Sequence, residues 1–141
     1  MLQSVDQAVA DDPSAGFTTI VAFAMTESFV CGASSGDSAA VAICANRPAQ
    51  ILTEHQHKNP PVGSGGAAFV PFHAKLGSIW TLMAMSDGVW KYVGWENIFL
   101  AVAGRSGREV ADELLERARL RPSGMLQDDF TLVVLQASTN G

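Results

Sequence analysis

The sequence predicts an α+β fold. Apolar strand-like runs fill most of the stretch from residue 18 to residue 85, helical spacing follows them, and one apolar run closes the chain. A group of strands followed by a group of helices is typical of antiparallel sheets with segregated helices. The length of 141 residues suits one domain with a substantial core. We therefore expect a single domain over residues 1–141.

The first half of the chain should contain one helix and then strands. Leu2, Val5 and Val9 recur at helical spacing, which predicts a short amphipathic helix that ends before Asp11. Alternating and continuous apolar runs predict four strands in a meander, over residues 18–25, 28–34, 39–45 and 50–53. Residues 54–67 are rich in Pro and Gly and predict a loop. Further strands are expected at residues 69–72 and 79–85.

The second half should be mostly helical until its last strand. A short helix is expected over residues 95–102. Ser106 and Glu109 have the spacing of a capping box, in which each side chain bonds the other residue's backbone amide. The helix that they begin carries one apolar face and should stop at Pro122; that face consists of Val110, Leu114, Leu115 and Ala118. Residues 132–135 predict a closing strand.

Composition excludes some functions and favours a location. The formal net charge is −5 and the chain has no Lys/Arg cluster, which argues against nucleic-acid binding. The apolar runs are too short to span a bilayer, and no signal peptide precedes them. We therefore expect a cytoplasmic protein that does not act in a membrane. Cys31 and Cys44 lie in strand-like runs, which favours small buried thiols over a disulfide or a metal pair.

Three acidic motifs at strand ends are the most informative feature of the chain. They are Gly36-Asp37-Ser38, Ser86-Asp87-Gly88 and Asp128-Asp129-Phe130-Thr131. Each motif alone is compatible with an ordinary turn, since Gly and Asp are common turn residues. If the fold gathers the carboxylates, a divalent cation with hard oxygen ligands best relieves their repulsion. The motifs together therefore predict a Mg²⁺ or Mn²⁺ site and hydrolysis by metal-bound water.

On these motifs the sequence resembles the metal-dependent Ser/Thr protein phosphatases, also called type 2C phosphatases. Bacterial stress-response and sporulation members of this group end on Asp-Asp, as Asp128-Asp129 does here. The likeness covers most of the chain. Besides the three motifs it rests on a Thr-Thr strand, a Leu-Thr segment and a Trp after Ser-Asp-Gly, here Thr18-Thr19, Leu52-Thr53 and Trp90.

The resemblance implies an αββα sandwich of two antiparallel sheets flanked by helices. It implies that Asp87 and Asp128 bind core metal ions, either Mn²⁺ or Mg²⁺, and that Asp37 belongs to a third and weaker site. It also implies a phosphoprotein substrate, whose phosphorus is attacked by a metal-bound water without a protein nucleophile. This last implication is consistent with a chain that shows no evident Ser-His or Cys-His arrangement.

The chain departs from the family pattern in several places. The Asp-Gly-x-Gly-Gly segment and the early phosphate-binding Arg of the family are absent, so we expect a domain truncated at its N-terminus. Gly63-Ser64-Gly65-Gly66 is the only Gly cluster, and it lies too late in the chain to replace that segment. Lys91 stands where several members carry an acid, and Ala39 replaces a common Arg. Metal affinity should therefore be reduced.

Two functions remain open at this point. The first is a metal-dependent phosphoserine/phosphothreonine protein phosphatase. The second is a non-catalytic phosphatase-like module that binds a partner or regulates it, and whose exposed sheet edge favours a dimer. Other candidate sites have simpler explanations: His55 and His57 as solvated loop residues, Trp90, Tyr92 and Trp95 as packing, and Arg117, Arg119 and Arg121 as cations near a helix C-terminus.

Overall fold

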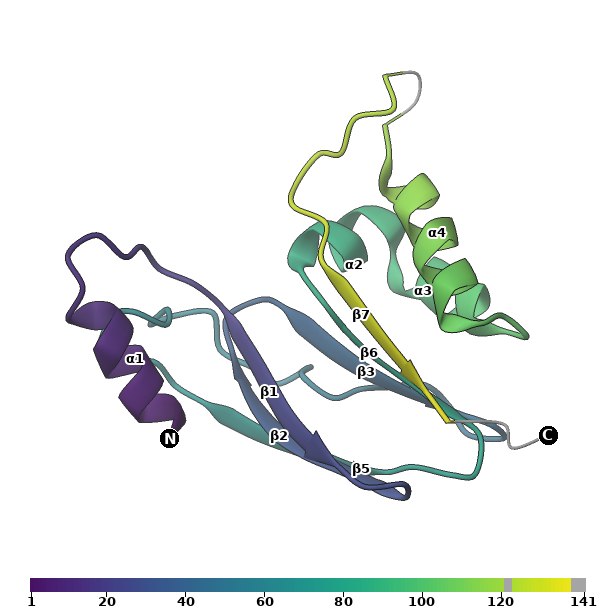
Figure 1. Ribbon diagram of the computed structural model, residues 1–141, viewed down its shortest axis with the longest axis horizontal. Helices are drawn as coiled ribbons and strands as arrows, with labels where there is room; N and C mark the ends of the chain where they lie inside the picture. The colour runs from purple at the N-terminus through teal and green to yellow at the C-terminus, as the bar shows by residue number, and fades with distance from the viewer. Residues whose placement is uncertain (121–122, 138–141) are drawn as a thin grey trace.

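The computed structural model describes residues 1–120 and 123–137 and contains two antiparallel sheets. One sheet has three strands in the order β1-β2-β5, and the other has four in the order β4-β3-β6-β7. The two sheets form adjacent layers with apolar side chains packed between them (Figure 1). The three-stranded sheet consists of β1 (Ile20–Met25), β2 (Phe29–Ser35) and β5 (Val70–Lys75), and the four-stranded sheet of β3 (Ala39–Cys44), β4 (Gln50–Ile51), β6 (Trp80–Met85) and β7 (Leu132–Gln136).

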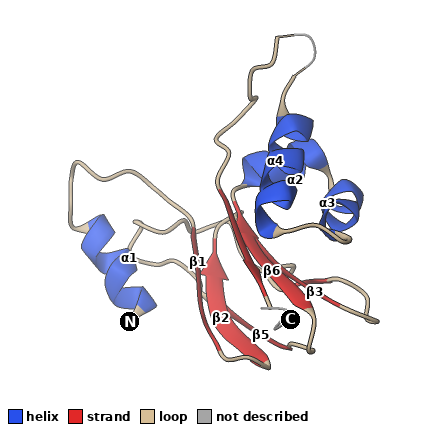
Figure 2. Cartoon of the chain, turned by 45° about the vertical axis from the view of Figure 1, so that its right-hand side comes forward, coloured by secondary structure: helices blue, strands red, loops and turns tan. Residues whose placement is uncertain are grey.

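Helices lie outside both sheets. Three of them cover the four-stranded sheet and one lies beside the three-stranded sheet, as Figures 1 and 2 show. The first group is α2 (Asp87–Val93), α3 (Trp95–Val102) and α4 (Gly107–Ala118), and the single helix is α1 (Leu2–Ala10). The α+β class and the αββα arrangement are thus confirmed. Among the described residues, no helix is long and apolar enough to span a membrane.

Two apolar cores hold these layers together. One lies between the sheets and includes Val30, Phe72 and Leu82. The other lies between the four-stranded sheet and the helices and includes Met83 and Ile98. Neighbouring residues of β6 thus serve different cores, because successive side chains of a strand point to opposite faces. The four-stranded sheet is therefore packed against apolar side chains on both of its faces.

The predicted meander was wrong. β2 lies between β1 and β5 and does not pair with β3. After β2 the chain crosses to the other sheet, where β3 pairs with β4 and β6. The last predicted strand of the meander is also shorter than expected, since β4 covers only Gln50–Ile51. A turn follows from residue 52, and the hydroxyl of the buried Thr53 accepts a hydrogen bond from the amide of Ala40 at 3.1 Å.

Other predictions had mixed outcomes. The first helix, the helix at Trp95–Val102 and the capping box of Ser106 and Glu109 are confirmed. Helix α4 ends at Ala118, with the extended Arg119 as its C-cap, so it stops before Pro122; Pro122 itself lies outside the described residues, as does Arg121. The prediction that both thiols are buried was wrong for Cys31, which faces outward on β2, while Cys44 is buried. Alternation explains the difference, since the neighbour of Cys31, Val30, fills the core.

Candidate metal centre

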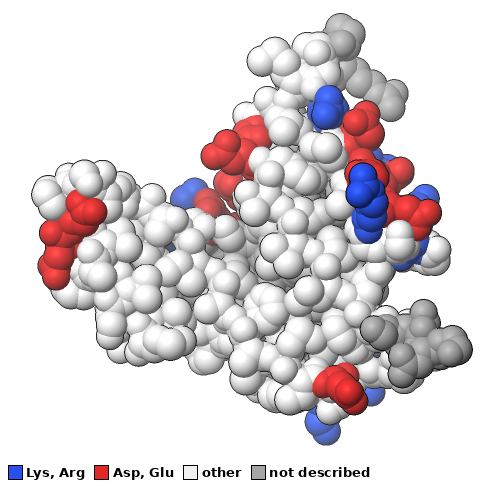
Figure 3. Space-filling model, viewed as in Figure 1, with Lys and Arg blue, Asp and Glu red and all other residues white. Residues whose placement is uncertain are grey.

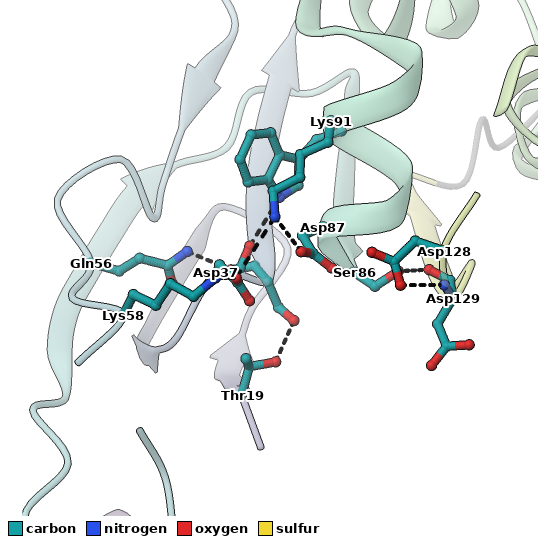
Figure 4. A network of polar contacts seen from close by, with 11 residues as sticks. Thr19, Asp37, Gln56, Lys58, Ser86, Asp87, Lys91, Asp128 and Asp129 are labelled. Atoms are coloured by element: carbon teal, nitrogen blue, oxygen red, sulfur yellow. Dashed lines mark hydrogen bonds and ion pairs between the residues drawn. The ribbon is translucent and has the colours of Figure 1, made fainter. Parts of the chain in front are cut away.

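The three acidic motifs meet at one pocket. It has a volume of about 480 Å³, and Asp37, Asp87, Asp128 and Asp129 are among its lining residues. Asp37 follows β2, Asp87 follows β6, and Asp128 precedes β7 in the chain. Figure 4 shows Asp37 and Asp87 next to each other, Asp128 further along beside Ser86, and the Asp129 carboxylate pointing away from the other three. The fold therefore gathers carboxylates that lie 50 and 41 residues apart in the sequence, from 37 to 87 and from 87 to 128.

The position of Asp37 depends on a tight turn at Gly36. Gly36 has a φ of +109°, a conformation that glycine adopts far more easily than other residues. A Cβ at this position would lie only 2.4 Å from Cγ2 of Thr19. The hydroxyls of Thr19 and Ser38 form a hydrogen bond of 2.5 Å across the same turn. The Thr-Thr strand of the sequence thus supports the first acidic motif directly.

Asp87 is the first residue of α2, a helix that the sequence reading had not predicted. Its carboxylate therefore lies at a helix N-terminus, where the macrodipole favours negative charge. The preceding residue, Ser86, connects this helix to the third motif. Its Oγ donates to the carbonyl of Asp129 at 2.8 Å and accepts from the amide of Thr131 at 3.0 Å. The second and third motifs are therefore one hydrogen-bonded unit.

Gly88 allows the third motif to approach α2 closely. A Cβ added to Gly88 would lie 2.2 Å from the backbone oxygen of Asp129 and 3.1 Å from Cβ of Asp128. Any side chain at this position would push the loop away from the helix. The glycine of Ser86-Asp87-Gly88 thus serves to bring Asp128 beside Asp87, which a turn alone would not require.

Trp90 connects the first motif to the second. Its Nε1 donates a hydrogen bond of 2.9 Å to the backbone carbonyl of Asp37. Its ring also stacks on Trp95 at a centroid distance of 5.8 Å, as expected for a packing role. Sequence reasoning foresaw the packing of Trp90 but not its hydrogen bond to the acidic turn.

Two lysine ammonium groups lie among the carboxylates. Nζ of Lys91 is 2.5 Å from Asp87 Oδ2 and 3.9 Å from Asp37 Oδ2, and Nζ of Lys58 is 2.6 Å from Asp37 Oδ2. Figure 4 shows Lys91 reaching between the two aspartates. Its hydrogen bond lowers the pKa of the Asp87 carboxyl, and the same hydrogen bond raises the pKa of Lys91. Sequence reasoning expected Lys91 to repel a cation and gave no role to Lys58.

The donor set suits a hard divalent cation. Carboxylate oxygens are the ligands that Mg²⁺ and Mn²⁺ prefer, and the Lys91 ammonium already stands in as a cation between two of them. Within the described part of the chain, however, no three Asp, Glu, His or Cys side chains converge closely enough to hold a metal ion by themselves. His55 and His57 are exposed in their loop. A metal here would need water ligands besides Asp87 and Asp128.

A further carboxylate with an unusual environment escaped the sequence reading. Asp6 of α1 is only 3% exposed. Its carboxylate accepts hydrogen bonds from the amides of Gly63 at 2.6 Å, Gly65 at 3.3 Å and Ala67 at 2.9 Å. These bonds, that of Ala67 first, lower the pKa of Asp6 although burial opposes them. Asp6 lies outside the acidic pocket and attaches α1 to the Gly-rich loop.

Several solved structures share this architecture. A bacterial serine phosphatase matches with a TM-score of 0.75 and 18% identity, over 96% of this chain and 65% of its own. The catalytic domain of the serine/threonine phosphatase PstP, solved with two manganese ions, matches with a TM-score of 0.72, 18% identity and the same two coverages. Stp1 from Staphylococcus aureus matches with a TM-score of 0.70, 18% identity and coverages of 96% and 63%.

These likenesses show the fold, and the chain spans less than two thirds of the length of each of these proteins. A search among curated proteins found no match. The family model described as stage II sporulation protein E (SpoIIE) matches residues 1–138, which is nearly the whole chain. The protein therefore belongs to the SpoIIE family of type 2C-like phosphatases, as its three acidic motifs had predicted.

Proposed function

We propose that the acidic pocket is the active site of a metal-dependent phosphoserine/phosphothreonine protein phosphatase. The observation that carries this proposal is that all three acidic motifs line one pocket. Solved structures of the same fold are described as serine or serine/threonine phosphatases, and one of them contains two manganese ions. A phosphoprotein is accordingly the proposed substrate.

In this proposal Asp87 and Asp128 hold Mn²⁺ or Mg²⁺, and Asp37 supplies an accessory ligand. The bound ion would supply an activated water for attack on the phosphorus of the ester. Two neighbouring side chains, Ser86 and Trp90, keep these carboxylates in place. Ser86 holds the loop of Asp128 against α2, and Trp90 holds the turn of Asp37 against the same helix.

Fixed positions matter here because a small displacement of a reacting group can lower a rate about a hundredfold. The ligand set that this chain offers is small, since two carboxylates and an accessory one would share the ion with waters. We therefore expect weak binding of the divalent ion and a slow hydrolysis.

The test is a Mn²⁺ titration by calorimetry, with p-nitrophenyl phosphate hydrolysis measured in the same samples. The proposal predicts heat of binding and turnover in the wild type, and loss of both in Asp87→Asn. Asp112→Asn is the matched control, because Asp112 is exposed on α4 and is not among the residues that line the pocket. Binding that is unchanged by Asp87→Asn would contradict the proposed ligand set.

A second candidate is a non-catalytic phosphatase-like module that acts by binding. It is favoured by Lys58 and Lys91, whose ammonium groups already neutralise carboxylates of the pocket. β1 and β7 are edge strands of their sheets, and the face over them carries few charged side chains in Figure 3. In this case we expect pairing with a second copy through such an edge. Light scattering that shows a monomer at high concentration would count against that pairing.

A further inference from the structure

Lys91 is placed differently from an ordinary surface lysine. It extends from α2 over the ring of Trp90, with Nζ 5.5 Å from the ring centroid, and reaches two carboxylates from separate elements. Asp87 lies one helical turn before it, whereas Asp37 belongs to the turn after β2. Only 38% of the Lys91 side chain is exposed, and the Asp37 and Asp87 side chains are 20% and 24% exposed. Partly buried charges of like sign repel each other more strongly than solvated ones.

From this geometry we propose that Lys91 is the tethered cation of the acidic pocket: it holds Asp37 and Asp87 together without a metal and competes with a divalent ion for them. Lys58 neutralises Asp37 from the other side, but it is 66% exposed and contacts only that carboxylate. Lys91 is thus the one of these two lysines that joins two motifs. The second half of the inference, the competition, rests on the proposed function, whereas the first half does not.

Competition follows from the position of the ammonium. A divalent ion bound to Asp87 would face the positive charge of Lys91 unless that side chain swings away. Movement of Lys91 away from the pocket would also break its hydrogen bond to Asp87 Oδ2. Lysine suits such a role because its ammonium is a compact point charge on a flexible stem. The chain would then exchange one cation for another as the concentration of divalent ion changes.

The first experiment compares thermal unfolding of Lys91→Met and Lys75→Met in EDTA. Lys75 lies exposed on β5, so both substitutions remove one positive charge and leave a similar apolar side chain. We expect the melting temperature of Lys91→Met to fall by roughly 3 °C relative to Lys75→Met. In the double variant Lys91→Met/Asp87→Asn, part of this loss should be regained, because the repelling carboxylate is gone as well. Equal melting temperatures in the two single variants would overturn the tethered cation.

The second experiment titrates the same variants with MnCl₂ and measures binding heat and the melting temperature. Lys91→Met should bind Mn²⁺ about tenfold more tightly than the wild type, and its melting temperature should rise more with Mn²⁺. Lys75→Met should bind like the wild type. If the wild type and Lys91→Met bind Mn²⁺ equally well, the competition is overturned while the metal site stands. If neither binds it and Lys91→Met is still destabilised in EDTA, the metal site of the proposed function fails and the tethered cation stands.

Discussion

Asp6 and the acidic pocket show two ways in which one fold accommodates carboxylates. The Asp6 carboxylate is buried, and three backbone amides of the Gly-rich loop donate hydrogen bonds to it. Asp37 and Asp87 in the pocket are compensated instead by the side chains of Lys58 and Lys91. Backbone amides are fixed in place by the fold, whereas lysine ammonium groups can move away on flexible stems.

This difference separates a structural carboxylate from one that is available to a ligand. The amides of the Gly-rich loop already donate hydrogen bonds to the Asp6 carboxylate, so a ligand could bind Asp6 only by displacing that loop. A ligand that binds the pocket carboxylates has to displace only partly exposed ion pairs, and each such pair contributes only about 0–1 kcal/mol to the free energy of unfolding. The same substitution, Asp to Asn, should therefore have different consequences in the two regions.

The largest effect is expected from Gly88→Ala, which separates the parts of the pocket. Its Cβ would lie 2.2 Å from the backbone oxygen of Asp129, so the loop before β7 has to move. We expect a loss of roughly 3 kcal/mol in the free energy of unfolding, measured by urea denaturation. Gly16→Ala serves as the control, because a Cβ there meets nothing within 4 Å. Equal stability of the two variants would mean that the loop before β7 can move away from α2 without a loss of stability.

Asp6→Asn should have the next largest effect. The amide group of Asn would present a donor to backbone amides that are themselves donors, which leaves buried groups without partners. We expect the melting temperature to fall by roughly 6 °C, whereas Asp112→Asn should change it by less than about 2 °C. A melting temperature near that of the wild type would show that the Gly-rich loop does not need the carboxylate.

Lowering the pH should reduce the stability of the protein through protonation of Asp6. The pKa of Asp6 is lowered in the folded protein, chiefly by the amide of Ala67, so the unfolded chain binds the proton more readily. The stability that Asp6 contributes is therefore present above its unfolded pKa and is lost as the pH falls through the folded one. Below about pH 4 the wild type should lose stability more steeply than Asp6→Asn, as measured by urea midpoints across the pH range. Parallel curves would contradict this assignment.

The smallest effect on stability is expected from Asp37→Asn. Its removal breaks two ion pairs, one of them with the exposed Lys58, and it also relieves repulsion from Asp87. We expect a change within about 1 kcal/mol of the wild type, measured beside Asp6→Asn under identical conditions. A loss as large as that of Asp6→Asn would remove the distinction between the two regions.

Sequence reasoning found the pocket because its carboxylates lie in short motifs with local signals. Gly36 and Gly88 mark the turn and the close approach that bring Asp37, Asp87 and Asp128 together. Asp6 gave no such signal, since its donors lie 57 to 61 residues further along the chain. The role of Lys58 was equally hidden, because the approach of its loop to the Asp37 turn is a product of tertiary structure.

The fold was predictable in its class and in most of its elements, but not in how its strands pair. Apolar runs showed where strands lie, whereas the crossing from β2 to the second sheet has no local mark. The helix α2 was missed because it is short and rich in β-branched and aromatic residues, which have only modest helix propensity. Its place after β6 is fixed by the bonds of Ser86 to the loop before β7.

The most direct test of this account is anomalous diffraction from a crystal of the protein soaked in MnCl₂. The account predicts a manganese peak between Asp87 and Asp128 in the acidic pocket, no peak at Asp6, and a displaced Lys91 side chain. A pocket without manganese at millimolar MnCl₂, or a manganese peak at Asp6, would contradict the division between ligand-binding and structural carboxylates.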